Sequence, residues 1–390
     1  MANVSNRAEE VPWSGIRKMF NLAAQVPEAV NLSVGQPDFD TPEHIVKAAK
    51  RALDEGYTQY TPGLGIPPLR EAIARKVWKE NKIKADPAKE IMVTVGAMEG
   101  IILTLLALVD PGDEVIISDP CYANYEAQVR LVNGVPVSVV AREVNEFNMD
   151  PDEIEQAITK KTKLLIINSP ANPTGAVLLQ SDLEAIAEIA QRHDLFVLSD
   201  EAYERLIYNG IEHISIARLL GMKERTISVF TFSKTYAMTG WRMGYVVGPE
   251  KVIEQMHKMQ EDVASCIPGF VQQAGIVALD GPQGCVDEMV AEYDRRRGFV
   301  VQALNEIDGV TCLEPKGAFY AFPNISSFGR TSEEVAVFLL SESKVTCVPG
   351  TAFGPRGEGH LRISYASSMG QLEEGMERIK EGVKRLRKKQ

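Results

Sequence analysis

Residues 226–247 read Thr226-Ile-Ser-Val-Phe-Thr231-Phe-Ser-Lys234-Thr-Tyr-Ala-Met-Thr-Gly-Trp-Arg242-Met-Gly244-Tyr-Val-Val247. Two apolar, β-branched runs, 226–231 and 244–247, enclose a polar segment, and such runs predict buried strands. Five similar runs precede them, at 91–95, 114–118, 135–140, 163–168 and 195–199. Helical patterns separate most of these runs. This alternation predicts an α/β fold, a doubly wound sheet with helices on both faces.

Capping signals predict where several helices begin. Thr41 before Pro42 predicts one start, Asp150 before Pro151 predicts a second, and Ser181 with Glu184 predicts a capping box for a helix near 182–192.

The pattern changes after about residue 250. Long helical stretches run to roughly 305, and short strand-like pieces follow at 310–313, 318–322, 345–348 and 361–365. A helix capped by Thr331 with Glu334 and a final helix near 370–388 complete the chain. We therefore expect a large domain over 41–284. Residues 1–40 and 285–390 are expected to form an N-terminal segment and a smaller α+β domain.

Composition excludes several classes of protein. The chain has 390 residues and a net charge of −11, which is unfavourable for general binding of nucleic acid or of a membrane surface. No apolar run is long enough to span a membrane, and Met1–Glu10 is polar, unlike a signal peptide. The five cysteines form no paired motif and the five histidines show no metal-ligand spacing. We expect no metal and a cytoplasmic location.

Polar residues follow the predicted strands at the edge where open α/β sheets bind ligands. Asn168-Ser-Pro-Ala-Asn172-Pro-Thr-Gly175 follows one strand, Asp200-Glu-Ala-Tyr203 the next, and Ser233-Lys234 another. Together with Arg242 and the helix start at Gly96-Ala97-Met98 they offer an amine, a carboxylate, a phenol, an amide and a cation.

This inventory fits pyridoxal phosphate. That cofactor needs a lysine for its Schiff base and a carboxylate that keeps its ring nitrogen protonated. A lysine reacts when burial or neighbouring positive charge lowers its pKa. A phenol and an amide can hold the ring oxygen as an anion, and a helix N-terminus with hydroxyls and an arginine suits the phosphate.

The chain resembles the class I, fold-type I pyridoxal-phosphate-dependent aminotransferases, in the branch of aromatic and bacterial-type aspartate aminotransferases. The resemblance rests on 231–244, on Asn31-Leu-Ser-Val-Gly35-Gln-Pro-Asp-Phe-Asp-Thr-Pro42 and on Leu361-Arg362-Ile-Ser-Tyr-Ala366, and it spans nearly the whole chain. It implies ping-pong transfer of an amino group between an L-amino acid and a 2-oxo acid such as 2-oxoglutarate. It also implies the α/β architecture of that fold type, with a mostly parallel seven-stranded sheet, and a homodimer with shared active sites.

The resemblance assigns the following roles, each an expectation. Lys234 is the Schiff-base lysine and proton shuttle, Asp200 pairs with the ring nitrogen, Tyr203 and Asn172 hold the ring oxygen, and Tyr122 stacks on the ring. The phosphate is bound by Gly96, Ala97, Met98, Thr231, Ser233 and Arg242, and by Tyr60 from the other subunit. The substrate α-carboxylate is bound by Gly35, Asn172 and Arg362.

The substrate side chain is less clearly indicated. Aspartate-selective relatives often carry a lysine where this chain has Met98, and the segments 16–20, 293–297 and 316–320 look more like those of aromatic-accepting members. An aromatic or broad specificity is therefore favoured, and aspartate stays possible. Two other function classes remain open from the sequence. One is a different reaction of the same cofactor, such as elimination or decarboxylation, because the motifs do not fix the reaction type. The other is a non-enzymatic effector-binding domain, which the lack of a basic DNA-binding module disfavours.

Overall fold

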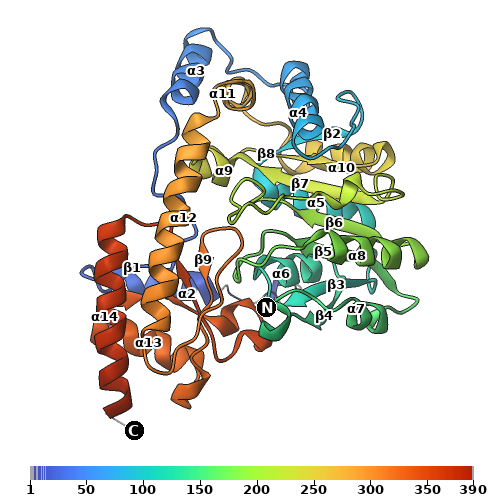
Figure 1. Ribbon diagram of the computed structural model, residues 1–390. Coiled ribbons are helices and arrows are strands. Elements are labelled where there is room, and N and C mark those ends of the chain that lie inside the picture. Colours follow the sequence, from blue (N-terminus) through green and yellow to red (C-terminus); the bar gives the residue numbers. More distant parts are fainter. Residues whose placement is uncertain (1–3, 6–7, 10, 12, 14, 389–390) are drawn as a thin grey trace.

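A seven-stranded sheet forms the centre of the larger part of the molecule (Figure 1). The computed structural model describes residues 4–5, 8–9, 11, 13 and 15–388. In spatial order the strands are β2 (Ile91–Thr94), β8 (Gly244–Val247), β7 (Thr226–Thr231), β6 (Phe196–Asp200), β5 (Thr162–Asn168), β3 (Glu114–Asp119) and β4 (Val135–Val140). All seven predicted runs form strands of this one sheet, so the predicted α/β fold is confirmed.

Strand direction explains why the sheet is only mostly parallel. Strands β4, β3, β5, β6 and β7 are mutually parallel neighbours, whereas β8 is antiparallel to both β7 and β2. The connection 232–243 contains one turn of α-helix, α9 (Phe232–Thr235). A parallel return normally needs a longer crossover helix, so the chain turns back beside β7 in the opposite direction. This return places residues 232–243 at the carboxyl ends of the parallel strands.

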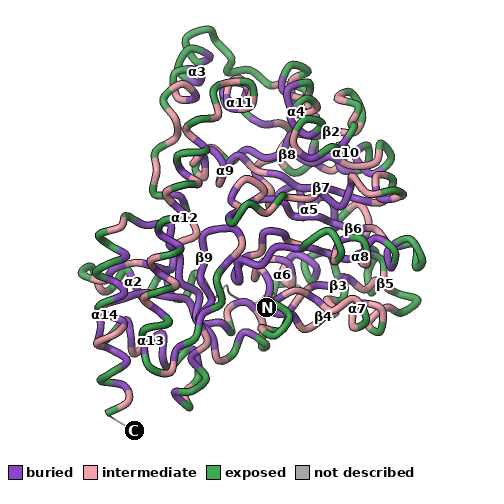
Figure 2. Tube along the Cα trace, in the orientation of Figure 1, coloured by how far each residue is buried: buried purple, intermediate pink, exposed green. Residues whose placement is uncertain are grey.

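Helices cover both faces of the sheet, as the alternation of apolar residues along β5 shows. Leu164 and Ile166 belong to the core formed with α5 (Gly96–Leu108), α6 (Asn124–Leu131) and α10 (Glu250–Val263). Leu165 and Ile167 point to the opposite face, against α7 (Pro151–Ala157) and α8 (Gln180–Arg192). The sheet is consequently buried along its centre while the helices expose their outer faces (Figure 2). At the β2 end lie α3 (Glu43–Asp54), α4 (Pro67–Lys79) and α11 (Gly269–Asp280).

The smaller part of the molecule lies at the lower left of Figure 1, around α13 (Ser332–Ser343) and α14 (Met369–Lys388). Its strands are β9 (Tyr320–Ala321), β10 (Val345–Thr346), β11 (Val348–Pro349) and β12 (Leu361–Ser364). Helix α12 (Gly284–Asn305) runs from the upper part of the view down to it. The N-terminal segment contributes α2 (Gly15–Ala23) and β1 (Val30–Asn31), and β1 pairs in parallel with β10.

Several details of the smaller part differ from the sequence prediction. Residues 310–313 form no strand and contribute only an isolated bridge from Thr311 to Asn324. The run 345–348 divides between β10 and β11, and the run 318–322 shortens to the two residues of β9. The described part of the chain also contains short 3-10 helices: η1 (Glu143–Asn145), η2 (Ile216–Arg218), η3 (Thr239–Trp241), η4 (Ser326–Phe328), η5 (Gly350–Phe353) and η6 (Pro355–Gly357).

Two predicted helix caps are confirmed and two are wrong. Asp150 accepts a hydrogen bond from the Asp152 amide, and Thr331 accepts one from the Glu334 amide. Thr41 does not cap α3, because its hydroxyl donates to the Ala237 carbonyl at 2.7 Å. The predicted Ser181–Glu184 box is replaced by Asp182, whose carboxylate accepts from the Leu179 amide at 2.8 Å.

None of the helices among the described residues has the length and apolar character needed to cross a membrane. The polar segment Met1–Glu10 lies mostly outside the described residues.

Candidate active site

A cavity of about 250 Å³ opens at the carboxyl ends of β5, β6 and β7. All the predicted site residues except Gly96 and Tyr60 line it. They are Gly35, Ala97, Met98, Tyr122, Asn172, Asp200, Tyr203, Thr231, Ser233, Lys234, Arg242 and Arg362. The wall also contains residues to which the sequence analysis gave no individual role, namely Ile16, Ile101, Tyr125, Asn168, Ala202 and Tyr320.

Lys234 lies on α9, just after strand β7 ends. Its Nζ donates a hydrogen bond to the Gly35 carbonyl at 2.6 Å. Burial lowers the pKa of the ammonium to about 8, and the positive charges of Arg362 and Arg242 act in the same direction. An amine with that pKa is partly unprotonated near neutral pH and can act as a nucleophile or a base.

Asp200 is the last residue of β6 and is buried. The Tyr125 hydroxyl donates to its Oδ2 at 2.6 Å, and the Ala202 amide donates to its Oδ1 at 3.1 Å. Burial raises the pKa of this carboxyl to about 6, although the Tyr125 bond favours the ionised form. A carboxylate held this way gains from a cationic partner in the cavity.

Tyr125 is a site residue that the sequence analysis missed. It lies on α6, whose sequence follows the Asp119-Pro-Cys-Tyr122 motif. The rings of Tyr122 and Tyr125 meet edge to face with centroids 5.5 Å apart. Tyr122 precedes α6, which begins at Asn124, so no helical spacing in the sequence marks Tyr125 as a site residue.

Arg362 comes from β12 in the smaller part of the molecule and is fully buried. Its guanidinium donates to Asn172 Oδ1 at 3.0 Å and to the Ser33 carbonyl at 2.5 Å. The Asn172 amide in turn donates to Asn168 Oδ1 at 2.9 Å, which fixes the loop that follows β5. Burial lowers the pKa of Arg362, and its Nε has no hydrogen-bond partner among the described residues. The site therefore contains a buried cation that is poised for an anion.

The N-terminus of α5 faces Arg242. Gly96 opens the helix with a φ of +70°, and a Cβ built there would lie 2.7 Å from the Arg242 guanidinium. The positive φ favours glycine, and a side chain at this position would displace the Arg242 guanidinium. Thr231 and Ser233 lie beside this point, with their hydroxyl oxygens 3.0 Å apart. Helix amides, two hydroxyls and a guanidinium together form a cradle suited to a phosphate dianion.

Tyr60 lies outside the cavity. Its side chain is 92 % exposed in the single subunit, in the segment between α3 and α4.

Comparison with known proteins gives the family. The model of the family "Aminotransferase class I and II" matches residues 27–379. The chain belongs to this aminotransferase family. It is 51 % identical to "Aspartate aminotransferase" of Pyrococcus abyssi over 96 % of this chain and 97 % of the relative. It is 48 % identical to "Aromatic-amino-acid aminotransferase 2" of Thermococcus litoralis over 98 % of each chain.

Solved structures give the same result. The crystal structure of the aromatic aminotransferase from Pyrococcus horikoshii OT3 superposes with a TM-score of 0.90 at 48 % identity, covering 95 % of this chain and 99 % of that one. Class I aminotransferases depend on pyridoxal phosphate and act on amino acids and 2-oxo acids.

The described residues fit this cofactor of the aminotransferase family. The cavity wall supplies an amine of lowered pKa, a buried carboxylate and a phenol, and the α5 cradle lies beside them. The glycine at position 96 leaves room where a Cβ would collide with Arg242, as a phosphate cradle requires. The donor set thus matches the amine, ring nitrogen, ring oxygen and phosphate requirements of pyridoxal phosphate.

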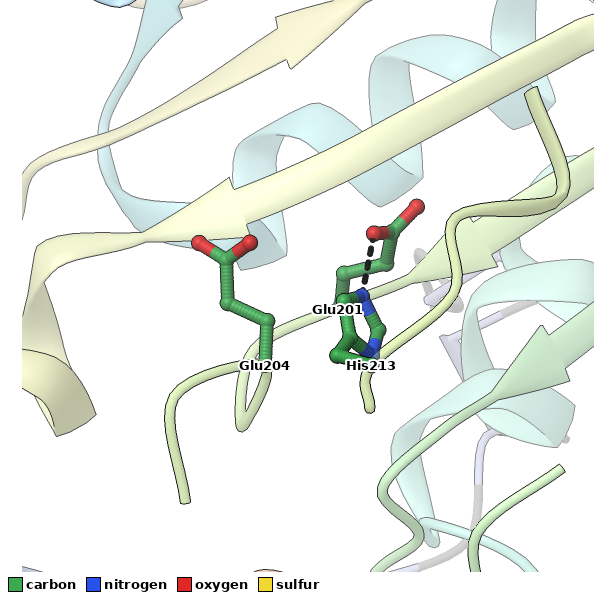
Figure 3. A group of neighbouring side chains, drawn as sticks. All are labelled: Glu201, Glu204 and His213. Atoms are coloured by element: carbon green, nitrogen blue, oxygen red, sulfur yellow. Dashed lines mark hydrogen bonds and ion pairs between the residues drawn. The ribbon is translucent and has the colours of Figure 1, made fainter. Parts of the chain in front are cut away.

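A second cluster of ionisable groups contains Glu201, which follows Asp200 in sequence, together with Glu204 and His213 (Figure 3). His213 Nε2 lies 2.7 Å from Glu201 Oε2, which also accepts from the Ser215 hydroxyl. Lys76 forms an ion pair with Glu204. The ammonium of Lys76 thus already supplies the positive charge that a metal ion would bring, and we propose no metal for this group.

Proposed function

We propose that this aminotransferase prefers amino donors with aromatic or other apolar side chains and has a broad specificity. The observation that carries the proposal is the lining of the cavity. Among the described lining residues the cations are Lys234, Arg242 and Arg362, and each has a proposed role in binding the cofactor or the α-carboxylate. A second carboxylate on the substrate would meet Met98 and apolar neighbours instead of a free cation. Aspartate is the alternative donor, because a relative with that name is 51 % identical.

The proposed binding of the amino acid starts from Arg362. Its guanidinium clamps the α-carboxylate, and Asn172 holds the guanidinium in place. The carbonyl of Gly35 accepts from Lys234, so in this proposal Gly35 orients the lysine as well as bordering the carboxylate subsite.

The proposed proton chemistry belongs to Lys234. With a pKa of about 8, its Nζ can take the α-proton of the amino acid as a base and later return a proton as an acid. Bound pyridoxal phosphate supplies an electron sink that stabilises the charge left on the α-carbon. Asp200 would hold the ring nitrogen, Tyr203 and Asn172 the ring oxygen, and Tyr122 the ring face. The phosphate would be held by Ala97, Met98, Thr231, Ser233 and Arg242 at the helix start formed by Gly96.

The remaining parts of the proposal concern the whole protein. We propose a homodimer in which Tyr60 of one subunit reaches the phosphate of the other, and its exposure in the single subunit is the support. We also propose the domain division 41–284 against 1–40 with 285–390. A cytoplasmic location is the last part, and its support is that all five cysteines are free.

The test of specificity is a panel of amino acids with 2-oxoglutarate as acceptor. We expect phenylalanine and tyrosine to equal or exceed aspartate in kcat/KM. A preference for aspartate of more than about tenfold, roughly 1.4 kcal/mol of transition-state stabilisation, would show that the side-chain pocket has been misread.

The test of the lysine is Lys234→Ala, with thermal unfolding as the control for folding. We expect loss of turnover by several orders of magnitude with the fold retained, because no other amine among the described lining residues can form the bond to the cofactor. Activity near that of the unmodified chain would rule out the proposed mechanism.

A further inference from the structure

Tyr320 contacts two of the groups that the proposed function uses. Its hydroxyl lies 2.8 Å from the hydroxyl of Tyr203, and the guanidinium carbon of Arg362 lies 4.5 Å from the centre of its ring. The side chain is 1 % exposed and lines the cavity. One residue therefore joins the phenol proposed for the cofactor ring to the cation proposed for the substrate.

The backbone fixes Tyr320 in this position. Strand β9 pairs with β12 in antiparallel register, so that Tyr320 lies opposite Ser364, two residues after Arg362. On the other side Gly35 leaves space for the hydroxyl, because a Cβ at position 35 would lie 2.1 Å from it. Phe319 packs edge to face on Tyr203 with centroids 5.4 Å apart. These contacts hold both phenols, and the hydroxyl pair has little freedom to separate.

The guanidinium of Arg362 has unusual surroundings for a buried cation. The ring of Tyr320 covers one approach and the ring of Phe353, whose centre is 4.8 Å away, covers another. Its hydrogen-bond acceptors are an amide oxygen and a backbone carbonyl, and no carboxylate within the described residues forms an ion pair with it. Aromatic faces stabilise a desolvated guanidinium without neutralising it. Tyr320 thus helps to keep the cation buried and available for a carboxylate.

We propose that Tyr320 is a positioning residue that polarises Tyr203 through its hydroxyl and holds the carboxylate-binding guanidinium through its ring. The inference rests on the proposed roles of Tyr203 and Arg362. Tyr203 has one hydroxyl proton, and when it donates that proton to a ring oxygen its own oxygen is free to accept from Tyr320. Two hydrogen bonds in series strengthen each other, so Tyr320 makes Tyr203 a better donor.

The experiment separates the hydroxyl from the ring. Tyr320→Phe removes the hydroxyl and keeps the ring, whereas Tyr320→Leu removes both. Tyr365→Phe is the matched control, because Tyr365 is also a buried phenol but its hydroxyl donates to the Ala318 carbonyl at 3.3 Å, and Tyr365 is not among the lining residues. Two quantities are measured on the holoenzyme. The first is the pKa obtained from the pH dependence of its visible absorbance, called below the pKa of the visible absorbance. The second is the dissociation constant of 3-phenylpropanoate, a carboxylate without an amino group.

We expect Tyr320→Phe to raise the pKa of the visible absorbance by about half a unit, since a weaker Tyr203 donor stabilises the ring oxyanion less. Its affinity for 3-phenylpropanoate should stay within about twofold. Tyr320→Leu should raise the same pKa and also weaken 3-phenylpropanoate binding about tenfold, because the guanidinium loses its aromatic face. Tyr365→Phe should change neither quantity, whatever its effect on thermal stability.

Tyr203→Phe separates a failure of the inference from a failure of the proposed function. If Tyr203→Phe raises the pKa and Tyr320→Phe does not, the hydroxyl link has no influence and the inference is wrong. If Tyr203→Phe itself leaves the pKa unchanged, the proposed role of Tyr203 fails and the inference loses its basis. In the Tyr203→Phe background, adding Tyr320→Phe should produce no further shift. An additional shift of half a unit there would contradict transmission through Tyr203.

Discussion

The buried carboxyl of Asp200 affects the stability of the fold as well as the chemistry of the site. Its pKa is about 6 in the folded chain against a reference value of 3.8, because the side chain is buried. The folded state therefore holds this proton more tightly than the unfolded state. Stability is unaffected by the group below about pH 4 and falls as the pH rises from about 4 to 6, as the buried group is forced to ionise.

The substitution Asp200→Asn should accordingly stabilise the cofactor-free protein at pH 8. We expect an increase of about 1–3 kcal/mol in the free energy of unfolding, and roughly half of that increase at pH 5. Urea denaturation of both proteins at the two pH values measures it, and activity should be lost in the variant. If the Asp200→Asn variant is no more stable at pH 8, the prediction is wrong. The hydrogen bonds from Tyr125 and the Ala202 amide then offset the cost of burying the ionised carboxylate.

Met98 lines the cavity and is proposed to be the residue that a distal substrate carboxylate would meet. The Tyr122 hydroxyl and the Asn124 amide both approach its sulfur, at 3.8 and 3.7 Å. Met98→Lys should raise the ratio of kcat/KM for aspartate to that for phenylalanine by at least about tenfold, since a distal carboxylate gains a cation partner. Met98→Leu, which has a similar volume and no charge, should leave the ratio nearly unchanged. Equal ratios in the two variants would place the side-chain pocket elsewhere.

At the residue scale, the sequence was informative where the chemistry requires a rare combination of groups. Lys234 and Asp200 were predicted because each follows a strand and suits a distinct part of the cofactor. Tyr125 was not predicted, and Tyr320 was noted only as part of the segment 316–320, because the value of both residues comes from hydroxyl contacts to other side chains. A tyrosine in the sequence gives by itself no indication of such a contact, as it is equally compatible with a core position.

The capping box of α8 begins two residues earlier than the sequence prediction placed it. For α8, Asp182 is the residue whose side chain bonds the Leu179 amide, whereas Ser181 is exposed. Asp182→Ala should lower the free energy of unfolding by about 0.5–1 kcal/mol, and Ser181→Ala should change it by less than about 0.3 kcal/mol. Urea denaturation of the two variants, with activity as the control for the site, tests this difference. The reverse order of the two effects would restore the capping box that the sequence suggested.

At the element scale, strands were easier to predict than caps or short strands. Each of the seven central strands is an apolar run that is long enough to be recognised by composition alone. Each cap depends on one hydrogen bond, and the Thr41 hydroxyl instead donates its hydrogen bond to the carbonyl of Ala237, a residue far along the chain. The two-residue strands β9, β10 and β11 owe their existence to pairing partners, and local sequence carries no signal for those partners.

At the scale of the whole molecule, the site is assembled from both parts of the chain. Lys234, Asp200 and Tyr203 come from the ends of the seven-stranded sheet, whereas Arg362 and Tyr320 come from the small sheet of β11, β12 and β9. The sequence order placed the first group together by the rule for open α/β sheets. It contained no physical rule that would bring β9 and β12 to the same cavity, and the resemblance alone suggested Arg362.

The proposed dimer predicts that mixing two impaired variants restores part of the activity. Tyr60→Ala should weaken cofactor binding, and Lys234→Ala should abolish turnover, so each variant is impaired alone at limiting pyridoxal phosphate. If Tyr60 completes the site of the partner, a mixed dimer of the two variants has one intact site. That site takes Lys234 from the Tyr60→Ala chain and Tyr60 from the Lys234→Ala chain. Equal mixing and reassociation gives half mixed dimers, so activity should reach about a quarter of that of the unmodified enzyme.

The size of the recovery distinguishes shared sites from independent ones. If each subunit instead used its own Tyr60, every site in the mixed dimer would carry one of the two defects, and activity would equal the mean of the two parent proteins. Joining the two substitutions in one chain and mixing it with the unmodified chain provides the control. In the mixed dimer of this control, shared sites would each carry one of the two defects. Independent sites would leave the site of the unmodified chain intact. If sites are shared, mixed dimers add activity in the first mixture and add little in the control mixture. If sites are independent, the reverse holds. Recovery in the first mixture without added activity in the control therefore shows that Tyr60 completes the site of the other subunit.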